Sequence, residues 1–220
     1  MMSVAPHFEV LGTEQREFWR ELGPTRELGL VLYGDTAITL RLGHRHSVDF
    51  DFFGLGPLDK NALRSAMPIL AAGEVVQDAP DTLTVIVGDV KVSFFGVGVS
   101  VLGAPDETDD GVLLVASQVD LLAHKLKVIL QRSDAKDYLD VAALLAAGVP
   151  LDTGLAGARS LFGATFPPAE ALRALTYFGD GDLERVADPV RDVLRDAVRK
   201  SRLMLQVDED DDALGQGQGQ

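Results

Sequence analysis

The sequence is poor in several residue types, and each shortage excludes a class of protein. It contains no cysteine, which rules out disulfides, thiolate metal sites and cysteine nucleophiles and is compatible with a reducing cytoplasm. No apolar run approaches the roughly 20 residues that a membrane span needs. Residues 1–12 lack the basic and apolar segments of a secretory signal. We therefore expect a cytoplasmic protein that has no membrane partner.

Positive charge is also scarce, because 20 Lys and Arg residues stand against 34 Asp and Glu residues and leave a formal net charge of -14. Nucleic-acid binding depends largely on Lys and Arg that neutralise phosphates, so any such contact has to be a local basic patch. Part of the acidic excess lies in residues 207–220, which end in a Gly-Gln repeat and are expected to form a disordered tail. A stripe of arginines could track RNA phosphates, but interleaved aspartates favour a salt-bridged solvent face. The stripe comprises Arg191, Arg195, Arg199 and Arg202, with Asp192 and Asp196 between them.

Hydrophobic periodicity predicts strands in the first half of the chain and helices in the second. Two β-like runs, 82–87 and 90–95, are joined by Gly88-Asp89, which is a strong signal for a two-residue hairpin. The predicted strands cover 28–33, 47–53, 82–87 and 90–95, and the predicted helices cover 13–22, 35–42, 58–72, 117–129, 135–147, 168–178 and 189–205. This segregation indicates an α+β domain over residues 1–115 and a helical domain over 116–206.

Two carboxylates, Asp49 and Asp51, lie one residue apart in the predicted strand 47–53. Alternation places them on one face and Val48, Phe50 and Phe52 on the other. Like charges this close repel, and burial would raise at least one pKa, unless a cation holds both groups ionised. Mg²⁺ fits because it takes hard oxygen ligands and often only one or two protein carboxylates. The other interpretation of the motif is the solvent-facing side of an amphipathic strand.

The residues before and after this strand have two interpretations each. Gly34 separates a strand from a helix, where it either forms an ordinary turn or lets a phosphate approach the positive helix end. Asp35 is a good N-cap for that helix. Lys125 and Arg132 are seven residues apart, and helical geometry alone favours a solvated basic face for them.

Several segments occur together and in a characteristic order. They are Tyr33-Gly34-Asp35-Thr36-Ala37, Arg41-Leu42-Gly43-His44-Arg45, Ser47-Val48-Asp49-Phe50-Asp51-Phe52-Phe53, Val90-Lys91-Val92-Ser93-Phe94-Phe95, and Leu121-Leu122-Ala123-His124-Lys125-Leu126-Lys127 with Arg132 and Lys136-Asp137-Tyr138-Leu139-Asp140. This combination resembles the AbiEii/AbiGii toxin family of nucleotidyltransferases. The resemblance implies a polymerase-β-like fold with a small mixed sheet and a helical C-terminal domain. It also implies nucleotide transfer from an NTP, in some members to tRNA 3′ ends, and an antitoxin protein as partner.

The resemblance further implies roles for individual residues. Asp49 and Asp51 would bind Mg²⁺ and act in catalysis. Lys125 would neutralise phosphate charge, and Asp137 would orient the nucleotide or receive a proton. The residues implied in nucleotide binding are Gly34, Asp35, Thr36, Arg45, Lys125 and Arg132.

Two positions depart from the family pattern and keep a second hypothesis open. Asp35 stands where the family usually has Gly or Ser, and a carboxylate there would repel phosphates. Ser93 stands where many polymerase-β-like enzymes have a third carboxylate, which Asp137 could instead supply. The leading hypothesis is a Mg²⁺-dependent nucleotidyltransferase acting on an RNA hydroxyl. The alternatives are a catalytically impaired module that binds a nucleotide or a protein partner, and transfer to a protein or small-molecule hydroxyl.

Overall fold

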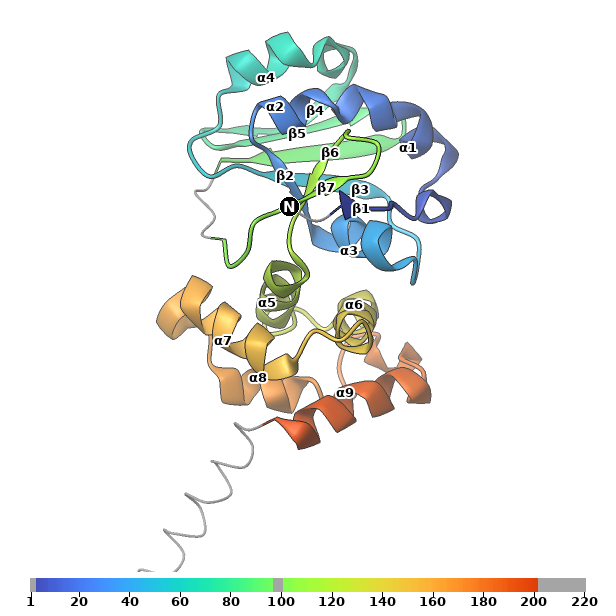
Figure 1. The fold of residues 1–220 in the computed structure, drawn as a ribbon, viewed down its shortest axis with the longest axis vertical. Helices are drawn as coiled ribbons and strands as arrows, with labels where there is room; N and C mark the ends of the chain where they lie inside the picture. Colours follow the sequence, from blue (N-terminus) through green and yellow to red (C-terminus); the bar gives the residue numbers. More distant parts are fainter. Residues whose placement is uncertain (1–2, 97–100, 202–220) are drawn as a thin grey trace, which may run out of the picture. The chain divides into compact units, whose positions relative to one another are not determined.

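The computed structural model describes residues 3–96 and 101–201. The chain forms two compact units, Met1–Leu121 and Leu122–Gln220, and the division falls within one helix, α5 (Gln118–Val128) (Figure 1). The predicted domain limits at residues 115 and 206 stay a prediction, and the predicted tail, 207–220, lies outside the described residues. Within the described ranges, no helix is both long and apolar enough to cross a lipid bilayer.

The first unit is built on one mixed sheet, whose strand order among the described residues is β1-β7-β8-β2-β3-β6-β5-β4. The central strand β3 runs antiparallel to β2 and parallel to β6, so it is paired on both sides. The strands are β1 (Ser3–Val4), β2 (Val31–Tyr33), β3 (Asp49–Phe53), β4 (Glu74–Ala79), β5 (Thr82–Val87), β6 (Val90–Phe95), β7 (Asp106–Thr108) and β8 (Leu114–Val115).

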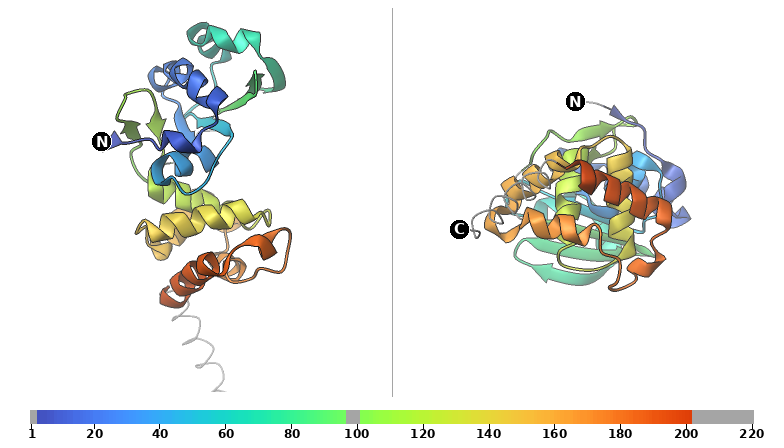
Figure 2. Two further views of the ribbon diagram at one scale, coloured as in Figure 1. Left: turned by 90° about the vertical axis from the view of Figure 1, so that its right-hand side faces the viewer. Right: turned by 90° about the horizontal axis from the view of Figure 1, so that it is seen from below.

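Helices cover both faces of this sheet, with α1 and α4 on one side and α3 on the other (Figures 1 and 2). Phe50 and Phe52 of β3 are fully buried on the α1 side, where Trp19 packs against Phe50 with ring centroids 6.4 Å apart. The opposite face of β3 carries its two carboxylates toward the start of α3. The helices of this unit are α1 (Thr13–Phe18), α2 (Pro24–Glu27), α3 (Gly34–Leu42) and α4 (Lys60–Ala66).

The second unit is helical and begins with the C-terminal part of α5. Gly154 lets α7 approach α5 closely, because a Cβ at this position would lie 2.5 Å from a methyl carbon of Leu122. Buried leucines from each helix form the core; they include Leu126, Leu144, Leu155, Leu172 and Leu194. The helices after α5 are α6 (Ala135–Ala146), α7 (Leu151–Phe162), α8 (Pro168–Ala174) and α9 (Asp188–Lys200) (Figure 2).

The structure confirms most of the predicted elements and corrects some of their ends. The hairpin of β5 and β6 has the predicted limits, with Val87 opposite Val90. The predicted start of α5 is also confirmed, because the Ser117 hydroxyl accepts a hydrogen bond from the Asp120 amide at 3.1 Å. Strand β4 and helix α7 were not predicted. The predicted N-cap role of Asp35 is wrong, since Tyr33 occupies the cap position and Asp35 lies in the first turn of α3.

Candidate functional site

The two carboxylates of β3 share one face of the strand, as the sequence predicts. Asp49 is opposite Lys91 of β6 in the register, and Asp51 is opposite Ser93. The Lys91 ammonium donates a hydrogen bond to Asp49 Oδ2 at 2.8 Å. Val48, which the alternation placed on the apolar face, precedes β3 and is 68% exposed, so the apolar face of this strand begins at Phe50.

Asp51 is the more enclosed of the two carboxylates. Burial raises its pKa, and the negative charges of Asp49 and Asp35 act in the same direction. The Ser93 hydroxyl hydrogen-bonds to the Asp51 carboxyl, and the Lys91 charge also favours its ionised form; both effects oppose the rise. A divalent ion at this face would remove the repulsion, and the available ligand atoms are carboxylate oxygens, which Mg²⁺ prefers. The residues present therefore fit such an ion.

Gly34 lies directly against Asp51 at the start of α3. Its φ of +71° belongs to the left-handed region, and a Cβ at this position would lie 3.1 Å from Asp51 Oδ2. Only glycine meets both conditions without strain. Because the backbone N–H groups of the first turn of α3 have no intrahelical partner, this end of the helix attracts negative charge. The structure thus places an anion-attracting helix terminus beside the carboxylate face.

The other predicted residues near α3 have partners within the protein. Asp35 forms an ion pair with Arg45 at 3.0 Å, and this positive charge offsets the carboxylate that departs from the family pattern. Thr36 is buried, and its hydroxyl bonds to Ser47 Oγ at 2.7 Å and donates to the Asp49 carbonyl oxygen. Thr36 therefore holds the start of β3 against α3.

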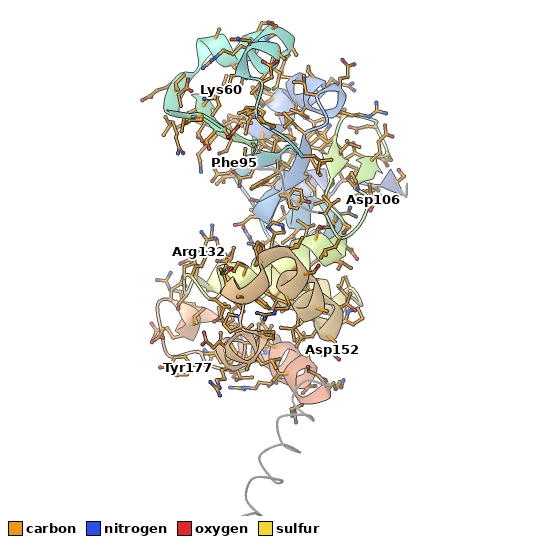
Figure 3. All side chains as sticks on the ribbon, turned by 90° about the vertical axis from the view of Figure 1, so that its left-hand side faces the viewer. Lys60, Phe95, Asp106, Arg132, Asp152 and Tyr177 are labelled. Atoms are coloured by element: carbon orange, nitrogen blue, oxygen red, sulfur yellow. The ribbon has the colours of Figure 1, made fainter. Side chains whose placement is uncertain are left out.

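A second charged cluster lies within the helical unit. Lys125 Nζ is 2.7 Å from Asp137 Oδ1 and 2.6 Å from Asp140 Oδ2, and both of these carboxylates are fully buried. Arg132 adds two hydrogen bonds to Asp137, at 2.7 and 3.0 Å. It lies in the connection between α5 and α6 and is 46% exposed (Figure 3). The solvated basic face predicted from helical geometry is therefore wrong for Lys125, whose side chain is only 5% exposed.

The arginines of α9 bind other groups of the protein, as the interleaved aspartates predict. Arg195 pairs with Asp192 at 3.6 Å, and Arg199 pairs with Asp196. The Arg191 guanidinium lies 4.9 Å from the centre of the Phe178 ring and donates to backbone carbonyls. The fourth arginine, Arg202, lies outside the described residues.

The ion pair of Lys91 with Asp49 was not predicted from the sequence. The two residues are 42 positions apart, and only the parallel pairing of β3 with β6 joins them. Lys91 and Ser93 have the same spacing as Asp49 and Asp51, but side chains two residues apart share a face in every strand, so this spacing does not indicate the register. Nor did the sequence indicate that the Asp140 carboxylate lies 2.6 Å from the Lys125 ammonium, as it does in the structure.

The family described as "Nucleotidyl transferase AbiEii toxin, Type IV TA system" matches residues 24–214 of this chain. The chain belongs to the AbiEii family. This match covers most of the sequence, including β3, Gly34 and the cluster around Lys125. The resemblance noted from the sequence motifs is thereby confirmed, and the AbiEii chain is a member of a nucleotidyltransferase family.

This AbiEii chain has relatives in sequence and in structure. An uncharacterized protein of Aquifex aeolicus (strain VF5) is 32% identical over 137 residues, which span 60% of this chain and 65% of the relative. A putative nucleotidyltransferase from H. pylori shares 18% identity at a TM-score of 0.54, over 84% of this chain and 90% of that one. The structure of ANT(2")-Ia in complex with adenylyl-2"-tobramycin shares 15% identity at a TM-score of 0.52, over 69% of this chain and 100% of that one. The two structural likenesses confirm the predicted polymerase-β-like nucleotidyltransferase fold.

Proposed function

We propose that this AbiEii chain is a Mg²⁺-dependent enzyme that transfers a nucleotide from an NTP to an RNA hydroxyl, with a tRNA 3′ end as the first acceptor to test. The observation that carries the proposal is the position of Asp51. Its carboxylate lies beside Asp49 and against Gly34, at the N-terminus of α3. Carboxylates for a divalent ion and a helix end for a phosphate are thus next to each other.

The residues of the first unit have complementary roles in this proposal. Asp49 and Asp51 hold the ion, and Gly34 leaves room for the triphosphate to approach the first turn of α3. Arg45 keeps the Asp35 carboxylate paired, so that its charge repels the phosphates less. When bound, Mg²⁺ neutralises triphosphate charge and lowers the pKa of the attacking hydroxyl. Catalysis then rests mainly on positioning and charge neutralisation.

The cluster of the second unit supplies the remaining proposed contacts. Arg132 keeps nearly half of its side chain exposed while it holds Asp137, so its guanidinium can also meet a phosphate. Lys125 lies between two buried carboxylates, and its contact with a phosphate requires it to release one of them. We assign Asp137 to orienting the nucleotide or receiving a proton. A cognate antitoxin is the proposed protein partner, in keeping with a family of toxin–antitoxin systems.

A second candidate is a nucleotide-binding or partner-binding module without transferase activity. Ser93 favours it, because this residue faces Asp51 from the neighbouring strand and supplies a hydroxyl where a third carboxylate would be expected. A serine is a weak ligand and a weak base in comparison with a carboxylate. Transfer to a protein or small-molecule hydroxyl is a third possibility, and the acidic net charge of -14 favours it over RNA.

One assay separates these candidates. The full chain is incubated with Mg²⁺ and each labelled NTP in turn. The acceptor is total tRNA, the protein itself with nothing added, or a mixture of hydroxylated small molecules. Asp49→Asn and Asp51→Asn are the test variants. Asp78→Asn is the matched control, because Asp78 also lies on a strand of the first unit and pairs with basic side chains, Lys60 and Arg64.

We expect label in tRNA with the unchanged chain and with Asp78→Asn, and its loss with both β3 variants. Label in protein or in a small molecule would move the proposal to another acceptor. Saturable NTP binding without transfer to any acceptor would support the binding module and contradict the transferase. Equal transfer by Asp51→Asn and by the unchanged chain would show that Asp51 of β3 is not needed for catalysis.

A further inference from the structure

Lys91 forms an ion pair with Asp49, one of the two carboxylates that the proposed function assigns to the metal. The ammonium nitrogen lies 2.8 Å from Asp49 Oδ2, and the side chains of Lys91 and Asp49 are 42% and 39% exposed. The Lys91 charge also acts on Asp51. Lys91 therefore interacts electrostatically with both carboxylates of β3.

We propose that Lys91 is a built-in counter-ion that a divalent metal displaces from Asp49, and that Lys91 thereby sets the metal affinity of the site. This inference rests on the proposed function, since it takes Asp49 as a metal ligand. The displaced ammonium then faces the negative charge that arrives with the nucleotide triphosphate. Lys91 is a positioning residue in this account, because it acts through Asp49.

Displacing Lys91 from Asp49 costs little free energy in this geometry. A half-exposed Lys–Asp pair contributes little to stability, and the ammonium is a strongly hydrated point charge on a flexible four-carbon chain. Rotation of that chain returns the nitrogen to water without any change of the strand. The buried pair of Lys125 with Asp137 and Asp140 differs in this respect, because those carboxylates are fully buried.

The register of the sheet places Lys91 and Ser93 opposite the two carboxylates of β3. Lys91 and Ser93 are successive residues on the same face of β6, opposite Asp49 and Asp51 respectively. At these two positions β6 therefore supplies one cation and one hydroxyl, so Lys91 brings a single positive charge to the two β3 carboxylates. A divalent ion that replaces Lys91 would neutralise both, so the exchange is electrostatically favourable.

The test measures metal binding without nucleotide and without activity. Mn²⁺ serves as the probe, and its binding to the full chain is followed by calorimetry and by the loss of the free-ion paramagnetic resonance signal. The variants are Lys91→Gln, Asp49→Asn, and Lys60→Gln as the matched control. Lys60 also belongs to the first unit and pairs with an aspartate, Asp78. We expect Lys91→Gln to bind Mn²⁺ about fivefold more tightly or better, Lys60→Gln to match the unchanged chain, and Asp49→Asn to lose binding.

A second measurement distinguishes displacement from a general charge effect and does not depend on whether a variant folds. The lysines of the unchanged chain are labelled by reductive methylation with carbon-13, and their resonances are followed during a Mg²⁺ titration. The Lys91 signal is expected to move toward that of a solvated lysine, while the Lys60 signal stays in place.

The outcomes separate the two proposals. If the unchanged chain binds Mn²⁺ through Asp49 but Lys91→Gln binds no more tightly, Lys91 is only a structural partner and the proposed function stands. Tighter binding with a static Lys91 resonance would refute displacement and leave a charge effect. No Mn²⁺ binding by any form, Lys91→Gln included, would overturn the metal site and this inference together.

Discussion

Replacing Gly34 by alanine is expected to damage the site through two separable effects. The first is backbone strain, because Gly34 has a φ of +71° and an L residue in that region costs about 1–2 kcal/mol. The second is local, because the new Cβ would lie 3.1 Å from Asp51 Oδ2. The carboxylate then has to give way by a few tenths of an ångström.

The expected loss of rate follows from this displacement. A misplacement of about 1 Å costs about 100-fold in rate, so the smaller shift of Asp51 is expected to slow nucleotide transfer by about tenfold. The free energy of unfolding is expected to fall by about 1–2 kcal/mol from the strain alone.

Gly29 provides a matched control for the strain. Its φ is +67°, close to that of Gly34, but a Cβ there would meet nothing within 4 Å. Gly29→Ala is therefore expected to lose a similar free energy of unfolding and to keep its transfer rate and Mn²⁺ affinity. The difference between the two variants isolates the contact with Asp51.

The assay combines urea unfolding with nucleotide transfer and Mn²⁺ binding on the folded fraction. Transfer by Gly34→Ala at the rate of the unchanged chain would show that the contact with Asp51 does not affect catalysis. An equal loss of rate in Gly29→Ala and Gly34→Ala would show that backbone strain, and not this contact, is the cause.

Two further predictions concern the charged groups. Burial and like charge raise the pKa of Asp51, so its folded state holds the proton more tightly than the unfolded chain, and this stabilisation is full below the unfolded value of about 3.9 and is lost as pH rises through the folded pKa. With a chelator present to remove metal ions, Asp51→Asn is expected to gain stability relative to the unchanged chain as pH rises above about 4, and a difference in urea unfolding that stays constant with pH would contradict this. Lys125→Met removes the cation that lies between two fully buried carboxylates, while Arg132 still holds Asp137, and it is expected to cost about 3–5 kcal/mol in unfolding free energy. A cost below about 1 kcal/mol, comparable to that of a surface ion pair, would show that the cluster does not depend on this lysine.

Features that depend on near neighbours in the chain could be predicted from the sequence. The hairpin of β5 and β6 has its predicted limits because Gly88-Asp89 encodes a two-residue turn. The carboxylate pair of β3 followed from alternation alone, since adjacent side chains of a strand point to opposite faces. The glycine turn before α3 was also evident, because only glycine readily adopts a positive φ.

Elements held by distant contacts could not be predicted in this way. Strands β1, β7 and β8 have two or three residues each, too few to show a period, and they form only by pairing with one another and with β2. Helix α7 contains Gly154 and Gly157, which weaken its helical signal, and packing of Gly154 against Leu122 compensates for them. The strand β4 is an exposed edge and has no alternating pattern of burial.

The sequence by itself therefore determined which side chains share a face, because the spacing of residues within a strand or turn sets this. Only the tertiary structure decided which charge each of them meets. Lys91 reaches Asp49 through the parallel pairing of β3 and β6, and Lys125 is enclosed by the carboxylates of α6. The physical reason is that electrostatic interactions depend on distance and burial, and for residues far apart in the chain both are set by packing.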